Sequence, residues 1–309
     1  MKIVFMGTPD FAVPCLKALA EGGHEVAAVF TQPDKPKGRG YKMIPTPVKK
    51  AAQEYGIPVY QPVSLRKGED AEAALEQLKS IAPDLIAVTA YGQILPKEIL
   101  ALPRLGCINI HASLLPKYRG AAPINWCILN GEAQTGVTSM MMSEGLDTGD
   151  MLIKRTTNIG ENETYEQLYS RLAVMGGEVL TETAAALEKG EIVPEKQDDS
   201  LSSYSPMIRK EMSALDFSKS AAEIHNTIRG VTGFTSLGGK RLKVYSSVIE
   251  RETAPEAANG EIVNAEAFTV KCGDGGLVTF REVQLEGSKR MNTGDFLRGR
   301  KLTKGEILG

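Results

Sequence analysis

The first half of the chain alternates short apolar segments with segments of helical periodicity, and this pattern constrains the fold more than any other feature. Apolar residues dominate Asp84–Ala90, as in a strand buried on both faces of a parallel sheet. Phe11–Ala20 carries its apolar residues at helical spacing, and Glu163–Glu188 is also expected to be helical. Strands that alternate with helices are typical of βαβ units. The sequence therefore predicts an α/β fold with a doubly wound, mostly parallel, Rossmann-like sheet.

After about residue 205 the pattern changes to short β-rich segments separated by turns rich in glycine and charge. One helix is expected at residues 220–229, followed by strands at residues 241–248, 260–263, 267–271 and 277–285. Short strands between such turns predict a small C-terminal β-barrel of the OB-like kind. The polar, Ser-rich segment Gln197–Ser205 is the expected linker. We therefore predict two domains, residues 1–205 and residues 206–309.

Composition excludes several classes of protein. Hydrophobic residues make up 42% of the 309 residues and charged residues 24%, which is ordinary for a globular protein. The longest apolar runs are far shorter than the roughly 20 residues that a membrane span needs, and no secretion signal is evident. We therefore expect a cytoplasmic protein with no membrane partner. The four cysteines form no close pairs, so neither a disulfide framework nor a metal site is expected.

Two polar side chains interrupt the carboxyl end of the strand expected at residues 107–110. Asn109 and His111 are two residues apart, so they point to the same face. Ligands of open α/β sheets bind beyond the carboxyl ends of the strands, and an amide beside an imidazole can stabilise the oxyanion of an acyl transfer. A hydrogen-bonded structural histidine is the alternative for His111. His225, inside the helix expected at residues 220–229, is expected at a surface or a domain interface.

A carboxylate strengthens the catalytic interpretation. Asp147 lies in the Gly-rich segment Gly145–Asp150, between two predicted strands and after three consecutive methionines. Asp-Thr-Gly is also common in simple turns, which is the alternative. A carboxylate beside an imidazole favours the protonated ring and fixes its orientation, while methionines offer a soft apolar wall for a flat ligand.

Six segments stand in the order and spacing of a known family. They are Gly7–Phe11, Thr31–Asp34, Ala90–Gly92, Asn109–His111, Ser113–Gly120 and Leu146–Asp150. Through these segments the chain resembles the methionyl-tRNA formyltransferase family, and the resemblance covers nearly its whole length. The Asn-x-His, Ser-Leu-Leu-Pro and Asp-Thr-Gly segments are shared by the wider folate-dependent formyltransferases, whereas the Gly-Thr-Pro-Asp-Phe start points to the tRNA branch.

The resemblance implies a reaction and a set of site residues. The expected reaction transfers the formyl group of 10-formyltetrahydrofolate to the amino group of initiator methionyl-tRNA. The resemblance implies two sets of residues: the catalytic Asn109, His111 and Asp147, and the folate-contacting Ser113, Leu114, Leu115 and Pro116. It also implies that residues 1–205 form the catalytic domain and that the β-barrel of residues 206–309 assists tRNA binding.

The stretch from residue 35 to residue 50 holds six cations and no acid. They are Lys35, Lys37, Arg39, Lys42, Lys49 and Lys50. Such a run exceeds the ordinary mixing of charges on a surface, although a solvated face is the alternative. We predict that Lys35, Lys37, Arg39 and Lys42 bind tRNA.

Two other functions remain open on the residues alone. A formyltransferase acting on a small amine, such as a sugar nucleotide or a purine precursor, would share the polar trio but would need no basic loop. A catalytically silent RNA-binding protein would need the loop but not the trio. The trio argues against the silent protein, because idle buried polar groups are costly.

One segment departs from the family's pattern. Members of the family usually carry a Pro-Trp-Pro run after the position of Gly230. Residues 231–236 of this chain are shorter and contain neither proline nor tryptophan.

Overall fold

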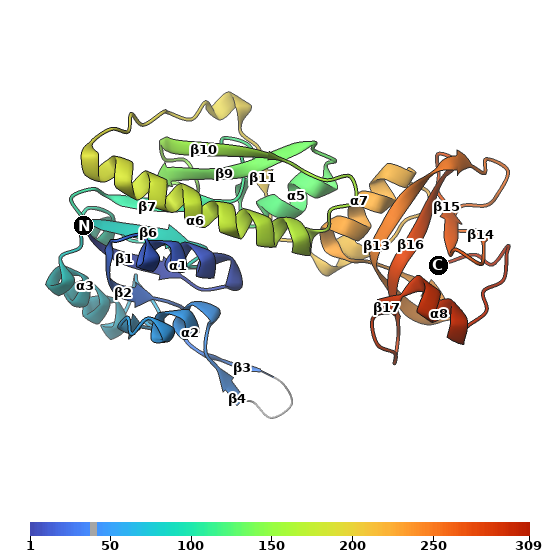
Figure 1. The fold of residues 1–309 in the computed structure, drawn as a ribbon, viewed down its shortest axis with the longest axis horizontal. Coiled ribbons are helices and arrows are strands. Elements are labelled where there is room, and N and C mark those ends of the chain that lie inside the picture. The colour runs from blue at the N-terminus through green and yellow to red at the C-terminus, as the bar shows by residue number, and fades with distance from the viewer. Residues whose placement is uncertain (38–41) are drawn as a thin grey trace. The chain divides into compact units, whose positions relative to one another are not determined.

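The computed structural model describes residues 1–37 and 42–309, which form two compact units (Figure 1). Unit 1 comprises Met1–Gly120, Gly136–Thr157 and Tyr169–Tyr204, and unit 2 comprises Ala121–Thr135, Asn158–Leu168 and Ser205–Gly309. The unit that holds the C-terminal residues thus also takes in two earlier segments. The division at residue 205 that the sequence suggests stays a prediction.

A seven-stranded sheet is the frame of unit 1. Its order is β10-β9-β7-β6-β1-β2-β5. Strands β1, β2, β5, β6 and β7 are parallel, and β9 is antiparallel to β7. The strands are β1 (Lys2–Gly7), β2 (Glu25–Phe30), β5 (Val59–Tyr60), β6 (Leu85–Thr89), β7 (Cys107–His111), β9 (Gln134–Met141) and β10 (Met151–Asn158). The predicted doubly wound, mostly parallel sheet is confirmed.

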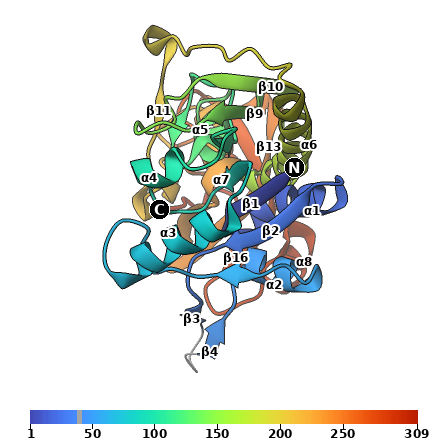
Figure 2. The same ribbon diagram turned by 90° about the vertical axis from the view of Figure 1, so that its left-hand side faces the viewer.

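Helices cover both faces of this sheet (Figures 1 and 2). Ala74 and Leu78 of α3 pack with Met6 of β1 on one face, and Gly176 of α6 approaches Ile110 of β7 on the other. The helices of this unit are α1 (Val13–Glu21), α2 (Pro47–Glu54), α3 (Glu69–Ile81), α4 (Lys97–Leu100) and α6 (Tyr165–Lys189), the last beginning in unit 2. The sequence predicts α1, α2 and α6, the second from a helical pattern at residues 47–55, whereas α3 and α4 have no predicted counterpart. No helix in the described residues is long and apolar enough to span a membrane.

Unit 2 is built on an antiparallel sheet of the order β12-β13-β16-β15-β14, with β17 beside β16. Phe268, Phe280 and Phe296 form the centre of its core. Its elements are α5 (Pro123–Leu129), α7 (Ala221–Val231), β12 (Gly233–Leu237), β13 (Lys240–Thr253), β14 (Ile262–Asn264), β15 (Thr269–Lys271), β16 (Gly276–Leu285), β17 (Met291–Asn292) and α8 (Thr293–Gly299). The predicted small β domain is confirmed.

The last residues of the chain join the two edges of this sheet. Ile262 of the edge strand β14 donates its backbone N–H to the carbonyl of Glu306 at 2.8 Å. Gly309 donates to the carbonyl of Ser236, in the opposite edge strand β12, at 3.2 Å. Backbone groups at both edges thus find partners in the tail, which gives the unit the closed character expected of a barrel.

His225 of α7 is buried, which corrects the expectation of a surface position, and its two partners lie on either side of the predicted division at residue 205. Its Nε2 donates to the carbonyl of Glu161 at 2.9 Å, so Nδ1 accepts from the hydroxyl of Ser247 at 2.8 Å. Burial, aided by the nearby Arg229 guanidinium, holds the pKa of His225 below its ordinary value. The helical spacing of apolar residues did not indicate that the buried face of α7 includes His225.

We expect His225 to make the free energy of unfolding depend on pH. The unfolded chain protonates this ring near its ordinary pKa of 6.5, whereas the folded protein binds the proton only at a lower pH. The stability contributed by the neutral ring is therefore complete above about pH 6.5 and is lost as the pH falls towards the folded value. Urea unfolding between pH 7.5 and pH 5 should show a steeper loss in the native protein than in His225→Gln. Equal slopes would contradict this assignment.

Candidate active site

The order of the strands places a ligand site at the carboxyl edge of the sheet of unit 1. From β1 the chain proceeds outward to β2 and β5 on one side, and β6 is followed by β7 on the other. The direction of winding reverses between β1 and β6, where crevices form at the carboxyl ends of the strands. The hydroxyl of Thr8, after β1, donates to the carbonyl of Tyr91, after β6, at 2.8 Å. Asn109 and His111 lie at the end of the next strand, β7.

The side chain of His111 is held in one orientation. It is buried, and its Nε2 lies 2.8 Å from the carbonyl oxygen of Tyr118. Because a carbonyl only accepts, Nε2 carries a hydrogen, and Nδ1 is left as the atom that can gain or lose a proton. Nδ1 lies 3.7 Å from Oδ2 of Asp147. That separation suits an ion pair and is too long for a direct hydrogen bond, so Nδ1 can donate to a reacting atom instead.

The carboxylate of Asp147 is anchored by one backbone group. The φ of this residue, 53°, is in the left-handed region, which is unusual for a residue other than glycine and is favoured only at a constrained position. The N–H of Gly120 donates to Oδ2 at 2.8 Å. No described residue donates to Oδ1. The carboxylate thus has one anchored oxygen and one that can accept a proton.

Gln197 holds the loop that carries this carboxylate. Its Nε2 donates to the carbonyls of Asp147 at 2.8 Å and Gly149 at 2.7 Å. Its Oε1 in turn accepts from Nε of Arg119 at 2.9 Å. From the sequence, Gln197 was expected in a linker, and this role was missed. Polar residues in a linker give no local signal of a bond formed 50 residues away.

The amide of Asn109 makes no hydrogen bond to any described residue, although the residue is half-buried in the sheet. Among the described residues, the fully buried side-chain atoms that lack a partner do not include those of Asn109, so its amide is open to solvent and can pair with a ligand. The structure therefore brings His111 and Asp147 together, with the unpaired Asn109 amide on the same strand face as His111. The catalytic roles of the three residues remain predictions.

Of the four residues expected to contact folate, two are buried and two are half-buried. Ser113 and Leu115 are buried: the Ser113 hydroxyl donates to the carbonyl of Lys117, and Leu115 packs with Met140 and Met151. Leu114 and Pro116 are half-buried. A ligand at this edge can thus meet the side chains of Leu114 and Pro116, but only the backbone of the other two.

The basic stretch forms a hairpin of β3 (Lys35–Lys37) and β4 (Lys42–Ile44). Lys35 is exposed and pairs with no carboxylate among the described residues. Arg39 lies outside the described residues. Lys49, by contrast, is paired with Asp34 at 2.7 Å and with the amide of Gln61. Lys35 is therefore available to a ligand, whereas Lys49 is bound within the fold.

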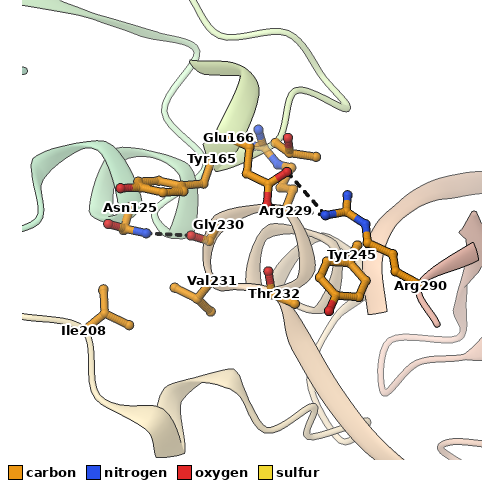
Figure 3. A pocket seen from close by; sticks show the side chains of 11 residues that line it. Asn125, Tyr165, Glu166, Ile208, Arg229, Gly230, Val231, Thr232, Tyr245 and Arg290 are labelled. Atoms are coloured by element: carbon orange, nitrogen blue, oxygen red, sulfur yellow. Dashed lines mark hydrogen bonds and ion pairs between the residues drawn. The ribbon is translucent and has the colours of Figure 1, made fainter. Parts of the chain in front are cut away.

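Unit 2 contains a separate hollow of about 310 Å³, shown in Figure 3. Its lining includes Val231 and Thr232, from the segment that departs from the family's pattern. Arg290 pairs with Glu166 at 3.4 Å and lies 4.0 Å above the Tyr245 ring. None of the expected catalytic residues lines this hollow, and Arg290 is already paired with Glu166 and Glu282.

The cysteines and histidines give no indication of metal chemistry. All four cysteines are buried and free, and burial raises the pKa of the Cys15 thiol to about 12. Among residues 1–37 and 42–309, no three of His, Cys, Asp and Glu are grouped as a metal site requires.

Comparison with known proteins gives matches along the whole chain. A family model described as formyl transferase matches residues 1–184, and one described as formyl transferase, C-terminal domain, matches residues 207–301. The methionyl-tRNA formyltransferase of Citrifermentans bemidjiense is 52% identical over 315 residues, which cover 100% of this chain and 96% of the relative. That of Geobacter sulfurreducens is 50% identical, with 100% of this chain and 97% of the relative covered.

Solved structures share the fold at lower identity. An N-formyltransferase from Helicobacter canadensis, in complex with folinic acid and dTDP-3-aminofucose, aligns with a TM-score of 0.68 at 22% identity, covering 91% of this chain and 98% of that one. HypX from Aquifex aeolicus, in complex with tetrahydrofolic acid, aligns with a TM-score of 0.66 at 19% identity, covering 100% of this chain and 50% of that one. At these identities the likeness shows the fold alone.

Gln197→Ala should lower turnover without unfolding the protein. The substitution removes both bonds that hold the Asp147 loop, and a displacement of about 1 Å at a catalytic group can cost roughly 100-fold in rate. We expect kcat for formyl transfer to fall by about tenfold or more. Gln53→Ala, which changes an exposed amide on α2, serves as the control. Normal kcat in Gln197→Ala would show that the loop holds its position without Gln197.

Proposed function

The chain belongs to the methionyl-tRNA formyltransferases, within the formyl transferase family, and from this we propose which of its residues perform the reaction. It is an enzyme that transfers a formyl group from a formyl-folate to the amino group of methionyl-tRNA. The pairing of His111 with Asp147, beside the free amide of Asn109, is the observation that carries the assignment of the site.

The formyl donor is 10-formyltetrahydrofolate, bound at the carboxyl edge beyond β7. Support comes from the chemistry of that edge. Leu114 and Pro116, which follow β7, are half-buried, whereas Met141 lies at the other end of that strand, paired with Ile108. The side chains of Leu114 and Pro116 offer an apolar wall to a flat ring, while the unpaired Asn109 amide offers a donor to the formyl oxygen.

The first step forms a bond between the amine nitrogen and the formyl carbon. Negative charge then develops on the formyl oxygen. The Asn109 amide and the Nδ1–H of His111 donate to this oxygen, because Nε2 is committed to Tyr118. Loss of one donor of this kind typically costs about 100- to 1,000-fold in kcat.

The second step breaks the bond between the formyl carbon and the folate nitrogen. The attacking amine loses a proton and the leaving nitrogen gains one. Asp147 relays this proton through Oδ1, directly or through water, while Oδ2 stays bound to the Gly120 N–H. The same carboxylate faces His111, with 3.7 Å between Oδ2 and Nδ1.

Initiator methionyl-tRNA is bound in part by the basic hairpin. Lys35, Lys37, Arg39 and Lys42 supply cations for the phosphates of the acceptor arm, and Lys35 is exposed for such contacts. The domain of residues 206–309 assists this binding. An enzyme of this kind works where initiator tRNA is charged, in the cytoplasm.

A direct assay tests the whole assignment. Purified protein is incubated with 10-formyltetrahydrofolate and methionyl-tRNA, with an amino-sugar nucleotide at equal concentration as the competing acceptor. Formylmethionyl-tRNA should be the product. Formylation of the sugar amine alone would favour the small-amine reaction instead.

Substitution of the trio should separate chemistry from binding. His111→Ala and Asn109→Ala should each lower kcat by about 100-fold or more, with folate affinity changed much less. Asp147→Asn keeps the shape but removes the charge and the proton acceptor, so kcat should fall severely and its pH profile should change. Folate affinity is measured by equilibrium titration. If Asp147→Asn keeps the native pH profile, the carboxylate has only a structural role.

Removal of basic-hairpin side chains should weaken tRNA binding in a salt-dependent way. Each lost phosphate contact lowers the slope of log affinity against log salt by roughly 0.7–0.9. Arg39→Ala and Lys35→Ala should raise KM for methionyl-tRNA and reduce this slope, while KM for folate is unchanged. Lys79→Ala, in an exposed helical pair with Glu76, is the control. An unchanged tRNA KM in both hairpin variants would identify the hairpin as a solvated face.

A further inference from the structure

A hollow of about 250 Å³ opens where β1 and β2 end and the basic hairpin begins. Its walls come from four places: the residue after β1, the turn after β2, strand β3, and the segment from the end of β4 to the start of α2. The lining residues are Thr8, Gln32, Pro33, Lys35, Pro36, Ile44, Pro45, Thr46 and Pro47. Four prolines and one isoleucine give it a largely apolar surface.

The hydroxyls in this lining already have partners. The Thr8 hydroxyl donates to the carbonyl of Tyr91 at 2.8 Å. The Thr46 hydroxyl accepts from the N–H of Lys49 at 3.1 Å and pairs with Thr31 at 2.8 Å. The Gln32 amide also donates to the Tyr91 carbonyl, at 3.4 Å, and Lys35 is the one charged side chain of the described lining. The hollow therefore suits a small apolar group.

The register of the sheet places this hollow near the catalytic residues. Met6 of β1 pairs with Val88 of β6, and Val88 pairs with Asn109 of β7, so the three form one row. Thr8 and His111 each lie two residues beyond this row. Adjacent strands are about 4.8 Å apart, so Thr8 lies roughly 10 Å from His111 across the edge. Asp147 follows β9, on the opposite side of β7.

We propose that this hollow binds the methionine side chain of methionyl-tRNA and thereby selects the aminoacyl group. This inference rests on the proposed function. An amine that reacts beside Asn109 has its Cα one bond away, and the methionine side chain extends about 5 Å further. The methionine side chain can therefore extend from β7 towards the hollow at β1. The flexible thioether fits an irregular apolar cavity of this kind.

Ile44 is the residue to test, because its neighbour supplies a matched control. Successive residues of a strand point to opposite faces. Ile44 of β4 lines the hollow, whereas Met43 is 55% exposed and does not. Ile44→Trp should fill the hollow, and Met43→Trp should leave it open. Both variants keep the catalytic residues and every cation of the hairpin.

The assay compares one tRNA body charged with methionine or with alanine. The native enzyme should prefer methionyl-tRNA by about tenfold or more in kcat/KM. An apolar pocket typically discriminates by at least this factor between two substrates that differ by one methylene group. In Ile44→Trp, kcat/KM for methionyl-tRNA should fall to the level of alanyl-tRNA, while kcat/KM for alanyl-tRNA and KM for folate stay unchanged. Met43→Trp should behave as the native enzyme.

Three outcomes would overturn the inference. If the native enzyme formylates both charged tRNAs equally well, no pocket selects the side chain, although the proposed function stands. If Ile44→Trp lowers kcat/KM for both tRNAs equally, the hollow holds a part of the tRNA body. If it raises KM for folate, the hollow belongs to the donor. The proposed function itself fails only if neither tRNA is formylated by the native enzyme.

Discussion

The hydrogen bond between His111 Nε2 and the Tyr118 carbonyl is the contact on which the chemistry of the site depends. It commits one ring nitrogen to the backbone, so the proton that matters is the one on Nδ1, facing Asp147. The segment that turns away from β7 thus orients the imidazole that ends the strand. Gly120, two residues after Tyr118, binds Asp147 as well. A single short segment therefore positions both members of the ion pair.

Much of this arrangement could be predicted from the sequence because it follows from local periodicity. Asn109 and His111 are two residues apart on a strand, and the alternation of side chains along a strand is enough to place them on one face. The parallel sheet followed from apolar runs such as Asp84–Ala90. Asp147 was found because a Gly-rich loop between two strands is a local pattern.

What could not be predicted depends on contacts between distant segments. Gln197 holds the Asp147 loop, yet nothing in residues 197–205 distinguishes it from a polar linker. The burial of His225 could not be predicted because the helical spacing of apolar residues does not tell how many sides of a helix are covered. The hollow beside Ile44 joins residues after β1, after β2 and in β4, and only the folded chain brings them together.

The interleaving of the two units has a consequence for how the chain acquires its fold. The Asn125 amide of α5 bonds to the carbonyl of Gly230, 105 residues later, and the Trp126 indole to the carbonyl of Pro206, 80 residues later. During synthesis α5 therefore emerges long before its partners, and its apolar side stays exposed to solvent until they are made. Contacts of such sequence separation slow folding and lengthen exposure to aggregation. A fragment that begins at residue 206 would lack α5, so the natural folding unit is not a continuous stretch of chain.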